Sequence, residues 1–281
     1  MDNKREVRRL KNSMRRDLGV GDGSTPRSTR SSYSGWSPST GLMIAVVLLV
    51  VASAVFAFWA SRHRGSSVPS STGGAQALAT IRPSGIPSTV STRLANIMSL
   101  SPTQRKSAPA FSLINQSGDR VSLHSLAGKV VVLEFMDPHC TDICPIVSKE
   151  FIDAYRKLGS YANRVVFAAI NVNQYALSVQ DVAHFTSEQG LNSIPSWQFL
   201  TTNNLSSLKQ LWASYGIQVQ SRGPTADVIH SSIVYFISPH GTEQYLASPQ
   251  VDHTAGGTAF LPLSQQEAWG QGIAAIAKSM L

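Results

Sequence analysis

Twenty consecutive uncharged residues run from Gly41 to Ala60 and separate a basic N-terminal segment from the rest of the chain. Most of them are apolar, and at about 1.5 Å per helical residue the run matches a hydrocarbon core of about 30 Å. Trp36 and Trp59 flank it, as amphipathic rings often do at the headgroup level. A cleaved secretory signal is the competing interpretation, but forty residues precede the run and Phe58 spoils a small-residue cleavage site. The sequence therefore predicts one transmembrane helix.

Charge is distributed unevenly around this run. The net charge is +8, yet residues 1–107 hold 15 Lys and Arg against 4 acidic residues, whereas residues 108–281 hold 9 against 12. A nucleic-acid-binding domain carries its positive patch on the fold, so we expect no nucleic-acid partner. The nine basic residues before Gly41 favour a cytoplasmic N-terminus and an extracytoplasmic C-terminal domain at the cell membrane. Counted within about 20 residues of the run, however, the basic residues on its two sides tie.

Composition predicts the organisation of the rest. Residues 61–107 are rich in Ser, Thr, Pro and Gly and contain no acidic residue, which is typical of a tether that buries little apolar surface. Within it, Leu94, Ile97 and Met98 recur at helical spacing and predict a short helix packed on the edge of the domain. The expected parts are a basic cytoplasmic tail at 1–40, the anchor at 41–60, the tether at 61–107 and a folded domain at 108–281.

Downstream of residue 108 the sequence has the pattern of a compact α/β domain. Lys129–Met136 and Arg164–Val172 are nearly continuous apolar runs, typical of strands covered on both faces. Ser264 and Glu267 form a capping-box pattern that would open a last helix. A hairpin, then alternating strands and helices, then a second hairpin predict an α/β thioredoxin-like fold with an N-terminal β-hairpin. The remaining elements are expected at residues 111–114, 121–123, 145–158, 178–189, 197–202, 205–214, 233–238 and 243–247.

The only two cysteines of the chain, Cys140 and Cys144, follow a predicted buried strand and open the predicted helix at 145–158. A helix N-terminus stabilises anions, so at least one thiol should have a lowered pKa, which favours both metal binding and redox chemistry. An inert disulfide would close a very short loop and add little stability. Thioredoxin-like oxidoreductases have two residues between their cysteines, whereas the three residues here let both sulfurs converge on one soft ion such as Cu(I) or Zn.

An imidazole would complete a site suited to copper in either oxidation state. His230 is the best candidate, because it directly precedes the predicted strand at 231–238 in the part of the domain expected beside the cysteines. His139 adjoins Cys140, but the turn can point it away. His184 is more typical of a surface helix, and no context supports His253. The other histidines, which are less favoured, are His63, His124 and His240.

At these residues the chain resembles the Sco (SenC) family of membrane-anchored copper chaperones for cytochrome c oxidase. The resemblance spans roughly residues 108–281 and includes the anchor and the tether. It implies that Cys140, Cys144 and His230 bind copper and that the recipient is the copper-binding subunit of the oxidase, at a CuA-type site. The segments that carry it are Cys140-Thr-Asp-Ile-Cys-Pro145, Val228-Ile-His230-Ser-Ser, Trp197-Gln-Phe-Leu-Thr201 and Leu211-Trp-Ala-Ser-Tyr-Gly-Ile217.

Three further positions bear on that resemblance. Asp142 matches the acidic residue between the family's cysteines, where it would tune the site without ligating; a favourable interaction with the helix dipole is an equally good interpretation. Ile229 stands where many members have Asp directly before the histidine. Met136-Asp-Pro-His139 replaces a commoner Gly-Tyr-Thr-type approach to the cysteines. Neither departure removes a ligand, but both would alter access or affinity.

Glu134 leaves a second function open. It interrupts an apolar strand six residues before Cys140, at the offset where thioredoxins carry a buried carboxylate for proton transfer. Buried there, it would have a raised pKa suited to general base work, whereas a position at the rim would pair it with a lysine. In a thiol–disulfide oxidoreductase that keeps partner cysteines reduced, Cys140 would attack, Cys144 would resolve and Glu134 would shuttle the proton.

A peroxiredoxin-like peroxidase is less favoured, because no isolated peroxidatic cysteine with its Thr and Arg support is present.

Overall fold

A computed structural model describes residues 81–226 and 228–281 of the chain. The predicted basic tail, the anchor at residues 41–60 and the first part of the predicted tether lie outside the described residues. Within the described ranges, no helix combines the length and the apolar character needed to cross a membrane.

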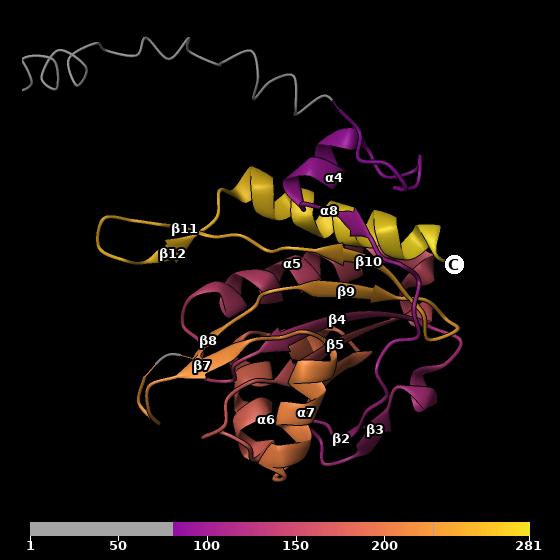
Figure 1. Ribbon diagram of the computed structural model, residues 1–281. Coiled ribbons are helices and arrows are strands. Elements are labelled where there is room, and N and C mark those ends of the chain that lie inside the picture. Colours follow the sequence, from indigo (N-terminus) through magenta and orange to yellow (C-terminus); the bar gives the residue numbers. More distant parts are fainter. Residues whose placement is uncertain (1–80, 227) are drawn as a thin grey trace, which may run out of the picture. The chain divides into compact units, whose positions relative to one another are not determined.

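A six-stranded mixed sheet in the order β1-β10-β9-β4-β5-β6 forms the centre of the domain (Figure 1). Its members are β1 (Ser101–Pro102), β4 (Val130–Met136), β5 (Val165–Asn171), β6 (Trp197–Leu200), β9 (Val234–Ile237) and β10 (Glu243–Ala247). β4, β5 and β6 are parallel, whereas β9 runs antiparallel to β4, β10 to β9 and β1 to β10. Every residue of β4 and β5 is buried, as their nearly continuous apolar sequence predicts.

Helices cover both faces of this sheet. α5 and α8 pack against one another on one face, where Phe151 and Trp269 are buried, and α7 covers the other face with Trp212 (Figure 1). The helices are α4 (Thr92–Ile97), α5 (Ile143–Leu158), α6 (Val179–Glu188), α7 (Leu205–Ser214) and α8 (Leu263–Ser279), with short 3-10 turns at His124–Leu126, Gly159–Arg164 and Leu191–Ser193. Burying one stripe of each helix against the sheet is the main favourable term in such layered domains.

Three small hairpins complete the fold. They pair β2 (Ser112–Ile114) with β3 (Arg120–Ser122), β7 (Val219–Ser221) with β8 (Val228–His230), and β11 (Asp252–His253) with β12 (Ala259–Phe260). The unit β4-α5-β5, followed by the antiparallel pair β9–β10 and closed by α8, confirms the predicted thioredoxin-like α/β fold. The β2–β3 pair is the predicted N-terminal hairpin.

The folded part of the chain begins upstream of residue 108, the predicted start of the domain. Val90, Leu94 and Met98 are buried in the same core as α5 and α8, and β1 pairs with β10. The short helix predicted from apolar spacing is present as α4. A Cβ added at Gly272 of α8 would overlap the Met98 sulfur, so the two helices approach closely because Gly272 has no side chain.

The predicted capping box at the start of the last helix is wrong. α8 begins at Leu263 with Pro262 at its N-cap, and no side chain caps it. Because the helix starts one residue before Ser264, that hydroxyl lies inside the first turn instead of at the N-cap, where it would bond an otherwise unpaired backbone N–H.

Replacing Leu94 tests whether the segment upstream of residue 108 contributes to stability. Leu94 is 5% exposed, and removing a buried leucine side chain costs about 2–5 kcal/mol. We expect Leu94→Ala to lower the free energy of unfolding of the full-length protein by this amount in urea titrations. The control is Leu263→Ala, because Leu263 is 76% exposed and should change it by less than about 0.5 kcal/mol. Equal, small effects would show that α4 is dispensable.

Candidate metal centre

The two cysteines lie where β4 ends and α5 begins. The Cys140 N–H donates to the Asp137 carbonyl at 3.1 Å, and the Cys144 N–H donates to the Cys140 sulfur at 3.3 Å. Cys140 is half-buried and Cys144 is buried, and both are free thiols. The backbone N–H groups in the first turn of a helix have no partner within the helix. The sulfur of Cys140 accepts a hydrogen bond from one of these groups, the Cys144 N–H.

This geometry separates the pKa values of the two thiols. The hydrogen bond from the Cys144 side chain, helped by the backbone N–H groups of Cys144 and Asp142, lowers the pKa of Cys140. The same hydrogen bond, the burial of Cys144 and the charge on Cys140 raise the pKa of Cys144. Cys140 is therefore the thiol that ionises more readily, and the buried Cys144 keeps its proton to higher pH.

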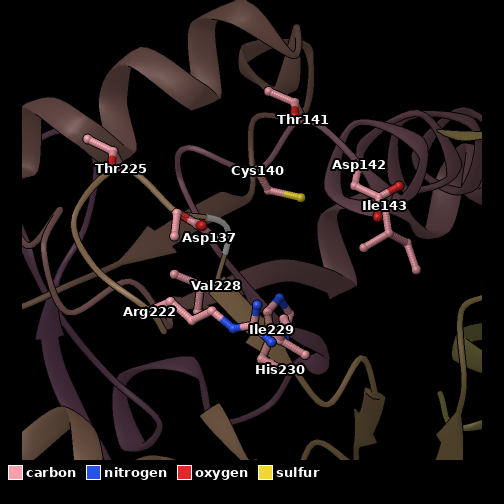
Figure 2. A pocket seen from close by; sticks show the side chains of 11 residues that line it. Asp137, Cys140, Thr141, Asp142, Ile143, Arg222, Thr225, Val228, Ile229 and His230 are labelled. Atoms are coloured by element: carbon pink, nitrogen blue, oxygen red, sulfur yellow. The ribbon is translucent and has the colours of Figure 1, made fainter. Parts of the chain in front are cut away.

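Cys140 and His230 line the same pocket although ninety residues separate them in sequence. This cavity, the His230 pocket, has a volume of about 590 Å³. In Figure 2 the Cys140 sulfur lies on one side of it and the His230 ring, with the Arg222 side chain, on the other. The lining residues are Asp137, Cys140, Thr141, Asp142, Ile143, Arg222, Thr225, Ala226, Val228, Ile229 and His230.

His230 is held in a form that can ligate a metal. It is the last residue of β8, whereas the next strand, β9, begins at Val234, so the expectation that His230 directly precedes a strand at 231–238 is corrected. Burial lowers the pKa of His230 and keeps the ring neutral. Its Nδ1 lies 3.1 Å from the Ser231 carbonyl, the partner to which Nδ1–H donates, and this leaves Nε2 free to ligate.

Asp137 is a pocket residue that the local sequence pattern does not single out. It is buried, and its Oδ1 accepts hydrogen bonds from the His139 N–H and from Asn173 Nδ2, both at 2.8 Å. These bonds fix the turn that leads to Cys140, and the nearby carboxylate opposes the lowering of the pKa of Cys140. The sequence feature that could have identified Asp137 is its place as an acidic residue at the end of an apolar strand, directly before Pro138.

Asp142 has a partner that the sequence did not reveal. It occupies the N-cap of α5, but its side chain makes no capping hydrogen bond. Its Oδ1 instead lies 2.8 Å from Nε2 of His253, which is in the β11–β12 hairpin. His253 had no supporting context in the sequence, because a contact across 111 positions leaves no local pattern. The contact ties that hairpin to the loop between the two cysteines.

Glu134 is buried beneath the cysteines, so its interpretation as a rim residue paired with a lysine is wrong. Its Oε1 accepts from Ser232 Oγ at 3.0 Å. Burial raises the pKa of Glu134 to about 8, against the opposing hydrogen bond from Ser232. Its charge also raises the pKa of Cys144. A carboxylic acid is thus placed within electrostatic reach of the buried thiol.

The donor types of the predicted ligands suit a soft or borderline ion, but the side chains are not gathered around one point. Across the described ranges, no three His, Cys, Asp or Glu side chains lie close enough to hold a metal ion. Cys140 and Cys144 share a hydrogen bond, and His230 lies on another wall of the His230 pocket. A three-ligand site therefore requires the β7–β8 hairpin or the cysteine loop to close across this pocket.

Comparisons with known proteins identify the domain. A model of the family described as SCO1/SenC matches residues 101–255, more than half of the chain. The SCO1 protein homolog of Bacillus subtilis (strain 168) is 29% identical over 132 residues, which cover 47% of this chain and 68% of that protein. Protein SCO1 homolog 1, mitochondrial, of Arabidopsis thaliana is 29% identical over 135 residues, or 46% of this chain and 38% of that protein. The match thus spans well under half of the length of the plant relative.

Solved structures of Sco proteins also resemble the domain. The copper-bound structure of Arabidopsis thaliana ScoI matches with a TM-score of 0.49 at 24% identity, covering 62% of this chain and 99% of that structure. Apo Sco1 from Thermus thermophilus matches with a TM-score of 0.49 at 22% identity, covering 64% of this chain and 95% of that structure. From the extent of the family match, the chain belongs to the SCO1/SenC family.

Proposed function

We propose that this protein is a membrane-anchored, extracytoplasmic chaperone that binds copper through Cys140, Cys144 and His230 and delivers it to the copper-binding, CuA-type subunit of cytochrome c oxidase. The main observation behind the proposal is that Cys140 and His230 line the same pocket, and that Cys144 is hydrogen-bonded to Cys140. Membership of the SCO1/SenC family supports copper as the ion.

The chemistry of the ligands supports a transferable ion. Thiolates select Cu(I), and imidazole suits both Cu(I) and Cu(II). The pKa of Cys140 is lowered, which eases its ionisation to the thiolate that ligates, and the pKa of His230 is lowered by burial, which keeps the imidazole neutral. Cys144, whose pKa is raised, is the thiol that must be driven to lose its proton by the ion. The His230 pocket, at about 590 Å³, also has room for a recipient's ligand side chain beside the ion.

The proposed location rests on the sequence. The apolar run at residues 41–60 is long enough to span a bilayer, and the basic residues concentrated before it favour a cytoplasmic N-terminus. The domain that carries the cysteines would then lie outside the membrane, tethered near its surface, where the recipient subunit would be met.

Replacing His230 tests the chaperone directly. With the full-length, reduced protein, we expect His230→Ala to weaken binding of Cu(I) and Cu(II) by about 10- to 100-fold, since even outer-shell partners of ligands contribute that much. The measurement is competition with a chromophoric copper chelator. His240→Ala is the control, because His240 is exposed in the β9–β10 turn, at the opposite end of β4 from Cys140. Undiminished affinity in His230→Ala would contradict the proposal.

A second candidate function is thiol–disulfide exchange, and the burial of Glu134 beside Cys144 favours it. In this reaction the Cys140 thiolate attacks a partner's disulfide, and Cys144 then displaces the reduced partner and leaves an intramolecular disulfide. The proton of Cys144 must go to a base. Glu134, whose pKa burial raises to about 8, accepts it only in its ionised form, so this route should become faster as the pH rises towards 8. In this function His230 has no role.

Glu134→Gln separates the two functions. A glutamine keeps the acceptor for Ser232 but cannot take a proton. If exchange is the function, the rate of disulfide reduction should fall by about 10²–10⁴-fold, the usual contribution of general acid–base catalysis, with copper affinity little changed. The rate is measured with a small disulfide substrate and full-length protein. An unchanged rate, alongside weakened copper binding in His230→Ala, would leave the chaperone as the function.

The raised pKa of Glu134 also predicts a pH dependence of stability. Between pH 4.5, the ordinary value, and about 8, the unfolded chain releases this proton while the folded protein retains it. The free energy of unfolding should therefore fall as pH rises through this window, by up to about 1.4 kcal/mol per pH unit for this group.

Urea titrations of the reduced, full-length protein at several pH values measure this slope. Glu134→Gln should make the slope shallower and the protein more stable than the parent at pH 7. Glu150 and Glu243, whose pKa values burial also raises, should contribute to the slope that remains. Glu267→Gln is the control, because Glu267 is exposed. Parallel slopes in the parent and Glu134→Gln would show that Glu134 is charged at neutral pH.

A further inference from the structure

We propose a second copper site on the side of Cys140 that faces α6, at which Cu(II) binds to His139 and His184 before it reaches the thiols. The binding itself stands independently; its role in loading rests on the proposed chaperone function. A cavity of about 490 Å³, the His184 pocket, is lined by Pro138, His139, Cys140, Thr141, Pro145, His184, Phe185, Glu188 and Gln189. Cys140 and Thr141 line both this pocket and the His230 pocket.

The first ligand is oriented by a carboxylate that is itself fixed. His139 Nε2 lies 3.5 Å from Asp181 Oδ1. The other oxygen of Asp181 accepts from the backbone N–H and the hydroxyl of Ser178, at 3.0 and 2.7 Å, in the capping box of α6. Asp181 therefore has little freedom to move, and its contact with Nε2 leaves Nδ1 of His139 available for a metal.

The second ligand has the same kind of support. His184 Nδ1 lies 3.3 Å from Glu188 Oε2, one turn later on α6. Asp181, His184 and Glu188 are three and four residues apart, so they lie along one face of this helix. With Nδ1 paired to the carboxylate, Nε2 of His184 is the nitrogen left for a metal.

Two histidines that line one pocket, each with a carboxylate partner, match the outer shell of metal sites, in which a carboxylate fixes the tautomer of a ligating imidazole. Ordinary surface ion pairs would explain either pair alone. The observation that favours a site is that both histidines line the same cavity as Cys140. Imidazoles with nearby carboxylates favour Cu(II) over Cu(I), and the two negative charges attract a cation.

The site should be weak and exchangeable. The described side chains offer no third His, Cys, Asp or Glu close enough to complete a metal-holding group here, so water would fill the remaining positions. His139 and His184 are 56% and 72% exposed at their side chains, so both can turn towards an ion. Transfer to Cys140 is then a ligand exchange in which sulfur replaces an imidazole nitrogen. Copper keeps its oxidation state in this step.

Removing the thiols isolates the proposed site. In full-length protein carrying Cys140→Ser and Cys144→Ser, we expect one equivalent of Cu(II) to bind with an electron paramagnetic resonance signal showing coupling to two imidazole nitrogens. Adding His184→Asn or His139→Asn should weaken this binding by more than about tenfold and remove one nitrogen from the coupling pattern. His240→Asn in the same background should change neither. Binding that is indifferent to His139 and His184 would overturn the site.

Loading kinetics separate this inference from the chaperone function. When Cu(II) is mixed with the reduced parent, the thiolate-to-copper absorption band should appear faster than in His139→Asn/His184→Asn, and both should reach the same final intensity. Equal rates would overturn the loading role while leaving the chaperone in place. If the parent forms no thiolate–copper band but the thiol-free protein still binds Cu(II), the chaperone function fails and the second site stands.

Discussion

The hydrogen bond from the Cys144 N–H to the Cys140 sulfur, at the start of α5, is the interaction on which the chemistry of this protein depends. It exists because β4, buried on both faces, ends at Met136 and leaves six residues before the helix begins at Ile143. The first turn of that helix presents unpaired N–H groups to the sulfur. The side-chain hydrogen bond from Cys144, assisted by this backbone N–H, lowers the pKa of Cys140, whereas the same side-chain bond and burial raise the pKa of Cys144.

Hydrogen bonds across the carboxyl ends of β4 and β5 hold this arrangement in place. Asp137 bonds to Asn173, whose N–H in turn donates to the side chain of Asn171. Asn171 reaches on to Thr201 beyond β6. A fully satisfied polar network in a buried setting is rigid, so the cysteine loop is presented by a fixed sheet edge. His230 comes from a separate two-stranded hairpin, and this difference in support explains why the three predicted ligands are near one another without already being closed around an ion.

Much of the fold follows from local sequence. The apolar runs at residues 129–136 and 164–172 predict β4 and β5 because strands covered on both faces have no polar alternation to confuse the pattern. The absence of alternation also left open whether Glu134 is buried or at the rim, because the pattern does not show which face of the sheet its side chain occupies. The β7–β8 hairpin was missed because each strand has three residues, too few for a period to show, although Gly223-Pro224 between them is a turn signal.

The site was harder to predict than the fold, because its parts are joined by contacts between distant residues. Cys140 and Cys144 stand out by spacing, and His230 by its neighbours, but nothing local joins Asp142 to His253 or His139 to Asp181.

X-ray absorption spectroscopy of the Cu(I)-loaded, full-length protein tests the central claim most directly. The account predicts two sulfur and one nitrogen ligand per copper, with the nitrogen lost in His230→Ala. A coordination shell that is identical in the parent and in His230→Ala would contradict it.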